Sequence, residues 1–158
     1  MTDSLRRRLG LALAVLTGLF VLRVLGQALV AFFSVGFLPP MQQWYSGLVP
    51  YPALLPIQIA MVGVMVKLVA DVDRGAGYFS RANRRVGRFL KWFSYVYFAS
   101  MVARYAITMT VYPERRWFGG TIPIGFHMVL AAFVFVYGAY HLKYALESRA
   151  NRRRPPAS

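Results

Sequence analysis

The chain has 158 residues, of which 58% are hydrophobic, and it carries a formal net charge of +14. Soluble domains are roughly 45–50% apolar, and here the cations gather in short clusters between long apolar runs. This layout predicts a membrane protein and argues against a nucleic-acid-binding protein. Because the chain has no cysteine, it has no disulfides, thiolate nucleophiles, iron–sulfur clusters or zinc sites with cysteine ligands.

Four apolar runs predict an all-α fold, a polytopic membrane protein built as a four-transmembrane-helix bundle. Each run approaches or exceeds the roughly 20 residues that a helix needs to cross a bilayer. The predicted spans cover about 9–38, 53–70, 90–111 and 121–142 in a transmembrane domain of 1–148, and 149–158 form a basic tail. The tail is polar and contains prolines, so we expect it to be disordered.

The basic clusters predict an orientation. Arginines precede the first span, crowd the loop between the second and third spans and fill the tail, whereas "PPMQQWYSGLVPY" between the first two spans has no charge. The positive-inside rule then places both termini in the cytoplasm, an N-in/C-in topology. Because arginine far outnumbers lysine, as in GC-rich bacterial genes, we expect the bacterial cytoplasmic (inner) membrane.

Each predicted span carries a polar group, and the helix rise places these groups at one depth. Arg23 and Arg104 each lie about 21 Å from the cytoplasmic edge of their spans. Gln58 and His127 each lie about 9 Å below the outer edge of theirs. In a hydrocarbon core about 30 Å thick, all four reach the same level. Gln27 lies one turn beyond Arg23 on the same face.

The polar faces of the first and third spans extend further along each helix. Ser34 is expected to continue the stripe of the first span, and Tyr97, Ser100, Arg104 and Thr108 share one face of the third. The four helices therefore each bring polar groups to the outer half of the membrane, which predicts a pocket that opens outward.

The predicted polar layer has no acid, because no aspartate or glutamate lies inside any span. An arginine at the centre of a membrane helix costs about 2.5–3.5 kcal/mol on insertion scales. The cost can be met by snorkelling to the outer interface, by hydrogen bonds to carbonyl and amide groups, or by an anion from outside the chain. An acid on a partner subunit is a fourth solution.

We therefore expect an outward-facing ligand site that holds or passes a polar, anionic amphiphile or a lipid-linked group. The arginines would bind the anion through their fork of donors, the amides and the histidine would orient it, and two aromatic residues would line the entry. The expected site residues are Arg23, Gln27, Gln58, Arg104, His127, Trp44 and Tyr45.

Two other functions stay open. As the membrane anchor of a redox complex, the chain would bind quinone or heme through His127 and Arg104. His127 and His141 lie on one helix at a separation typical of diheme cytochromes b, but the chain has only 2 histidines and lacks the opposing pair. As a structural partner, it would use Arg23 to meet an acid on another membrane protein, or it would form a homodimer.

Nothing in the sequence requires an enzyme or a resident cofactor. No serine, histidine and buried carboxylate fall at one level, which argues against a catalytic triad. Asp71 and Asp73 form a lone acidic pair at the inner membrane edge, too few ligands to predict a magnesium site. We predict no metal site.

A basic, amphipathic segment leads into the third span. Its cations recur at helical spacing with apolar residues between them, which predicts a surface for anionic lipid headgroups. The alternative is that these cations only determine topology. The residues are Arg81, Arg84, Arg85, Arg88 and Lys91.

Small residues recur at four-residue spacing on the first span, at Gly10, Ala14 and Gly18, with Gly26 further along. Such a stripe lets another helix approach closely. We expect internal packing, with a dimer seam as the alternative.

The arginine-bearing first span and the turn "GLVPYPALL" resemble the opening of DoxX-type four-helix membrane proteins. The resemblance covers less than half of the chain and implies a four-helix membrane architecture, without assigning any functional residue.

Overall fold

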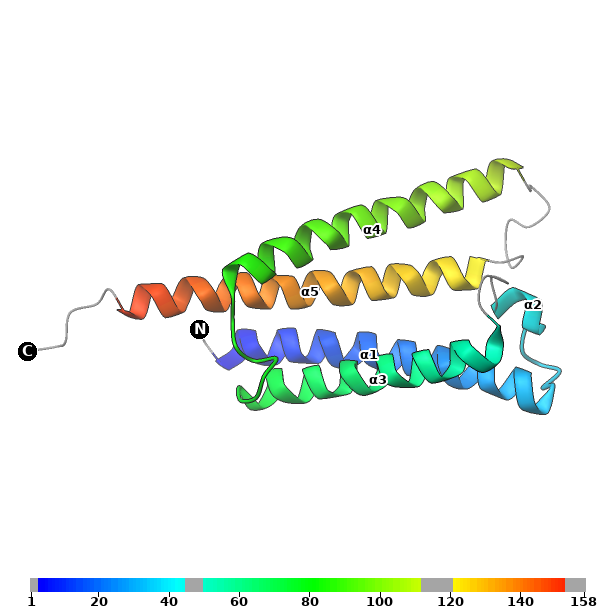
Figure 1. Cartoon of the computed structure of the whole chain (residues 1–158), viewed down its shortest axis with the longest axis horizontal. Helices are drawn as coiled ribbons and strands as arrows, with labels where there is room; N and C mark the ends of the chain where they lie inside the picture. Colours follow the sequence, from blue (N-terminus) through cyan, green and yellow to red (C-terminus); the bar gives the residue numbers. More distant parts are fainter. Residues whose placement is uncertain (1–2, 45–49, 112–120, 153–158) are drawn as a thin grey trace, which may run out of the picture.

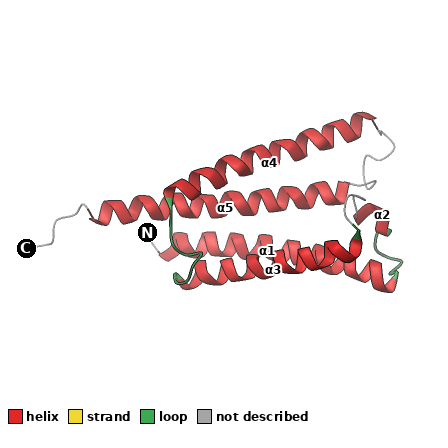
Figure 2. Cartoon of the chain, viewed as in Figure 1, coloured by secondary structure: helices red, strands yellow, loops and turns green. Residues whose placement is uncertain are grey.

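The structure, a computed structural model, describes residues 3–44, 50–111 and 121–152, nearly all of them helical (Figure 2). Four helices are long, and a fifth has four residues. They are α1 (Asp3–Phe33), α2 (Met41–Trp44), α3 (Tyr51–Arg74), α4 (Arg84–Val111) and α5 (Thr121–Arg152). The all-α prediction is confirmed for these residues.

The long helices lie side by side, with α1 and α5 at the centre (Figure 1). α1 packs on α3 and on α5, and α4 packs on α5. The start of α1, the α3–α4 loop (75–83) and the last turns of α5 lie at one end, here called the basal end. The opposite end, where α2 lies, is here called the α2 end.

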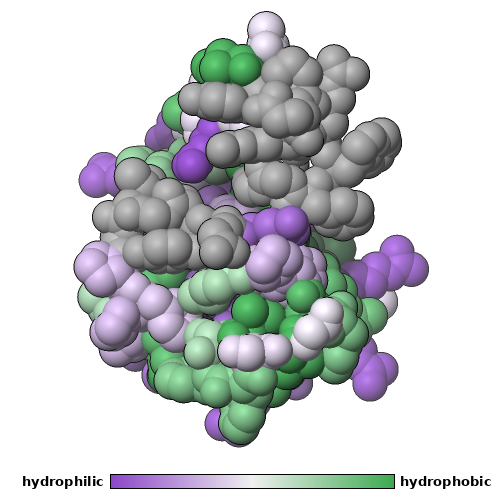
Figure 3. Space-filling view, turned by 90° about the vertical axis from the view of Figure 1, so that its right-hand side faces the viewer, coloured by the Kyte–Doolittle hydropathy of each residue, from purple (hydrophilic) through white to green (hydrophobic). Residues whose placement is uncertain are grey.

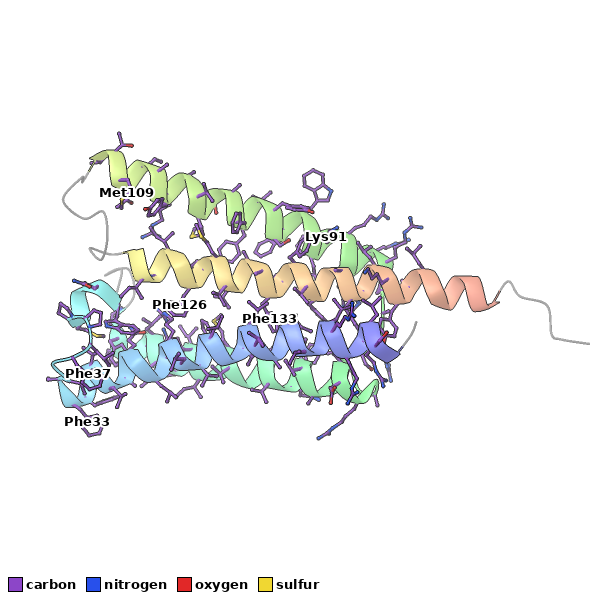
Figure 4. The ribbon with its side chains drawn as sticks, turned by 180° about the vertical axis from the view of Figure 1, so that it is seen from behind. Phe33, Phe37, Lys91, Met109, Phe126 and Phe133 are labelled. Carbon is purple, nitrogen blue, oxygen red and sulfur yellow. The ribbon has the colours of Figure 1, made fainter. Side chains whose placement is uncertain are left out.

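The core is shared by α1, α3 and α5. Apolar side chains from these three helices form one cluster, toward which Phe133 projects from α5 (Figure 4). The outward faces are also apolar: Leu11 is 66% exposed and Phe33 is 73% exposed. Viewed from the α2 end, green apolar residues gather over α1 and α3 in the lower part of Figure 3. The buried cluster consists of Leu13, Phe20, Val24, Met65, Leu68, Val72, Phe133 and Tyr140.

Three of the described helices are long and apolar enough to cross a membrane, which indicates a membrane protein. They are Ser4–Phe33, Tyr51–Arg74 and Ile122–Leu146. α4 is as long as these, but tyrosines, Arg104 and the basic residues of its first turns lower its hydropathy. The predicted span 90–111 is thus a helix, and its crossing of the membrane stays a prediction.

The helix boundaries differ from the predicted spans. α1 ends at Phe33, and Ser34 follows with a φ of 48°. This left-handed backbone ends the helix, so the expectation that Ser34 continues the polar face is wrong. α3 ends at Arg74, and Gly75 follows as its C-cap with a left-handed φ of 64°, which suits a glycine. α5 continues to Arg152, into the predicted tail, whose remaining residues 153–158 lie outside the described residues.

α4 and α5 touch closely at the basal end and diverge toward the α2 end (Figure 1). Two glycines permit the close contact. A Cβ at Gly87 would lie 2.9 Å from the Cβ of His141, and one at Gly138 would lie 3.1 Å from the backbone nitrogen of Lys91. The basal contact therefore fixes where α4 starts on α5.

We predict that Gly87→Ala lowers the thermal unfolding midpoint of the detergent-solubilised protein. The added methyl group has no room, and overpacking costs about 1–3 kcal/mol. Gly63→Ala is the matched control, because a Cβ there meets nothing within 4 Å. Equal midpoints for the two variants would contradict the close contact.

Candidate ligand site

A cavity of about 310 Å³ lies near the α2 end, with walls from all five helices. α4 contributes Tyr97, while α3 contributes Gln58 and Ile57. Because α3 and α4 do not form a close pair, the cavity occupies the space that a closed four-helix bundle would fill with side chains. Four residues of the predicted site line it together: Arg23, Gln58 and His127, whose predicted depths match, and Trp44.

Arg23 is nine-tenths buried in the wall of this cavity, with 9% of its surface exposed. Its Nη2 donates to the backbone carbonyl oxygen of Trp44 over 3.4 Å, at the long end of hydrogen-bond distances. Its Cζ lies 5.8 Å from the ring centroid of Phe126, which projects from α5 toward α1 (Figure 4). Nε is buried and has no hydrogen-bond partner among the described residues.

No carboxylate compensates the charge of Arg23 within the described part of the chain. The ion pair seen there joins Lys67 to Asp71 over 3.1 Å, near the basal end. The guanidinium of Arg23 thus has one long hydrogen bond, to a backbone carbonyl, and one contact with an aromatic ring. A buried cation in this state retains unused donors and a positive potential.

Gln27 and Gln58 form a buried amide pair beside Arg23. Gln58 Nε2 donates to Gln27 Oε1 over 3.0 Å. Gln27 is fully buried behind the cavity wall, whereas Gln58 lines the cavity. The second polar atom of each amide, Gln27 Nε2 and Gln58 Oε1, has no partner among the described residues. The pair therefore has spare hydrogen-bonding capacity at the site.

The opposite wall carries a second polar pair, joined by a hydrogen bond between the Tyr97 hydroxyl and His127 Nδ1. The two rings meet edge to face, with centroids 5.9 Å apart. Tyr97 was not among the predicted site residues, although the polar stripe of the third span contains it. Its position in the sequence pattern could have identified it.

Trp44 closes the cavity at the α2 end. Its indole Nε1 donates to the carbonyl oxygen of Pro39 over 2.8 Å. Its ring lies against Gly26, where a Cβ would come within 2.8 Å of the ring. Gly26 therefore makes room for an indole ring, and it is not part of a helix-packing stripe.

Arg104 does not line the cavity. It lies exposed on α4, two turns beyond Tyr97 toward the end of the helix. The predicted pairing of two arginines in one site is therefore not seen, although Tyr97 of the same helix reaches the cavity. Tyr45 lies outside the described residues.

The small residues of α1 face a groove instead of a helix interface. Gly10, Ala14 and Gly18 line an open groove of about 760 Å³ between α1 and α3. A Cβ at Gly18 would meet nothing within 4 Å. The expected internal packing of this stripe is therefore not observed.

The two histidines, which the sequence places on one helix, lie in different parts of the structure. His141 is buried at the basal end, where its Nδ1 accepts a hydrogen bond from the backbone N–H of Asn83 over 3.0 Å. His127 instead lies in the cavity wall.

The described residues contain no group of three or more side chains suited to hold a metal ion. Asp71 accepts hydrogen bonds from Lys67 Nζ and from the backbone N–H of Phe79.

Comparisons with protein-family models, curated proteins and solved structures found no match.

We predict that Gly26→Ala displaces Trp44. In a Trp92→Phe/Trp117→Phe background, Trp44 is the only tryptophan left of the 3 in the chain, so tryptophan emission reports on it alone. The added methyl group occupies the place of the ring, so emission shifts to the red and acrylamide quenching increases. Gly18→Ala serves as the control with open space at the Cβ. An unchanged Trp44 spectrum in Gly26→Ala would contradict this contact.

Proposed function

We propose that the chain binds or passes a polar, anionic amphiphile or lipid-linked group in the outer half of a bilayer, with the headgroup in the cavity beside Arg23. The observation that carries this proposal is the nine-tenths buried guanidinium, whose Nε has no partner and which has no carboxylate beside it among the described residues. An anion from the membrane would supply the missing charge. Charge-assisted hydrogen bonds to phosphate or carboxylate suit the donor fork of arginine.

The cavity favours an anionic headgroup with a tail that remains in lipid. Its lining offers a guanidinium, an amide, a phenol and an imidazole, and none of the described residues that line it is acidic. A cationic headgroup would meet the charge of Arg23 and find no counter-ion. Ile57 lines the cavity and is 51% exposed on the outward side of α3. A tail leaving beside Ile57 would reach the surrounding hydrocarbon directly.

The orientation belongs to the same proposal. α4 would be the fourth span, with both termini and the basal end in the cytoplasm and the cavity toward the outer leaflet of a bacterial inner membrane. The basic clusters support this orientation through the positive-inside rule, and α1 starts at the same end as the last turns of α5 (Figure 1). Arg104 would lie toward the outer interface.

Binding of three single-chain amphiphiles tests the proposal. Dodecyl phosphate, dodecanoate and dodecyltrimethylammonium share a tail and differ in headgroup charge. We expect saturable binding of the two anions to the full-length protein in maltoside micelles, measured by calorimetry, and none of the cation. Arg23→Gln should weaken anion binding about 10- to 100-fold, because a hydrogen bond to a charged group contributes about 1.5–3 kcal/mol.

Arg104→Gln is the matched control, since it removes an arginine of similar predicted depth that does not line the cavity. Its affinity should stay close to that of the wild type. An equal loss of anion affinity in the two variants would mean that the anions are attracted only by the general positive charge of the protein. Wild-type affinity in Arg23→Gln would exclude the cavity as the site. A third outcome would favour the structural-partner function. In it, neither anion binds, and another membrane protein that co-purifies with the wild type is absent from the purified Arg23→Gln variant.

A further inference from the structure

We propose that the basal end carries a second, separate site, a preorganised surface for the headgroups of anionic phospholipids. Its cations are Arg81, Arg84, Arg85 and Arg88, here called the arginine collar. All four are exposed, and no ion pair or hydrogen bond engages their guanidinium groups within the described residues. This inference does not depend on the cavity or on its ligand.

Charge complementarity selects the occupant. The sequence has no acid between Asp73 and Glu114, so nothing on the loop or on α4 neutralises the collar. Guanidinium groups bind phosphate oxygens in pairs, and basic residues near an anionic leaflet attract its lipids. A surface of this composition therefore selects anionic headgroups over zwitterionic ones.

The neighbouring apolar residues place the collar at the level of lipid headgroups. Phe89 is 66% exposed and Trp92 is 71% exposed, and they lie three residues apart on one side of α4. Phe89 also stacks on Phe93, with ring centroids 6.1 Å apart. Tryptophan is enriched at the interface between headgroups and hydrocarbon. A soluble polyanion would not account for these exposed rings, whereas a lipid supplies both a phosphate and an acyl chain.

Lys91, predicted as a member of this surface, turns toward α5 instead. Its Nζ lies 5.1 Å from the ring centroid of Phe135 and 5.9 Å from that of Tyr95. Figure 4 shows Lys91 on α4 near the basal contact with α5. Lys91 therefore belongs to the packing between these helices, and the collar has four cations.

The collar differs from an ordinary run of cations because its backbone is fixed. Tyr137 and Tyr140 on α5 donate their hydroxyl hydrogens to the carbonyl oxygens of Phe79 and Ser80, over 3.0 and 2.9 Å. The backbone N–H of Asn83 donates to His141 Nδ1 over 3.0 Å. These three bonds, here called the loop latch, hold the segment that bears Arg81 and begins α4.

The start of α4 is also capped, which orients the remaining arginines. Asn83 Oδ1 accepts the backbone N–H of Arg85 over 2.9 Å and that of Val86 over 3.4 Å, as an N-cap residue does. Because both the loop and the first helical turn are fixed, the arginines are displayed at set positions. Preorganisation of this kind lowers the entropic cost of binding.

Native mass spectrometry of the full-length protein tests the proposal, in micelles with equal amounts of phosphatidylglycerol and phosphatidylcholine. The wild type should retain more phosphatidylglycerol than phosphatidylcholine. The collar variant, with all four arginines changed to glutamine, should reduce this preference about tenfold. The matched control changes Arg149, Arg152, Arg153 and Arg154 to glutamine, which removes as many cations from the C-terminal segment, and should keep the preference.

A second variant guards against misfolding or inverted topology of the collar variant. Tyr137→Phe/Tyr140→Phe removes two latch bonds and keeps every cation, so the preference should fall to a level between wild type and collar variant. If this variant keeps the wild-type preference for phosphatidylglycerol, the loop latch does not preorganise the collar, and that part of the proposal is wrong. An equal loss of the phosphatidylglycerol preference in the control that lacks the four C-terminal arginines would contradict a specific site at the collar, because any four cations would then have the same effect. A preference that disappears in Arg23→Gln would place the retained lipid in the cavity and overturn the collar site.

Discussion

The energetic problem of this fold is a guanidinium that is buried among apolar helices, with no acid beside it in the described part of the chain. Arg23 makes one long hydrogen bond to a carbonyl and one contact with an aromatic ring, and its Nε stays unused. A buried charge is tolerated only when it is paired or fully hydrogen-bonded. The amide pair beside Arg23 also keeps unused polar atoms. The local structure thus lacks one component, and an anion has the right charge and geometry to supply it.

The helix arrangement explains why the cavity lies at one end only. At the basal end, glycines bring α4 onto α5, and the α3–α4 loop is bonded to two tyrosines of α5. Toward the α2 end α4 diverges (Figure 1), and Trp44, whose ring lies against Gly26, lines the cavity there. The basal end therefore holds α4 tightly against α5, while the α2 end contains a cavity with polar residues in its wall. Two sites with different chemistry follow from one bundle.

Periodicity and helix rise predicted the helices and the shared depth of Arg23, Gln58 and His127, because both depend only on local geometry. Other features depend on tertiary packing. The divergence of α4 separates Arg104 from the cavity, and the role of Gly26 requires knowledge of where the indole ring of Trp44 lies. The left-handed backbone at Ser34, which ends α1 early, has no signal in an apolar run. Tyr97 was visible in the polar stripe of its span, but that stripe also contained the more conspicuous Arg104.

The most direct measurement is an experimental density map of the protein purified with its native membrane lipids. We predict non-protein density in the cavity, with an anionic group within hydrogen-bond distance of Arg23 Nε. This prediction is contradicted if the guanidinium instead points toward bulk headgroups or pairs with an acid of another chain, and side chains fill the cavity.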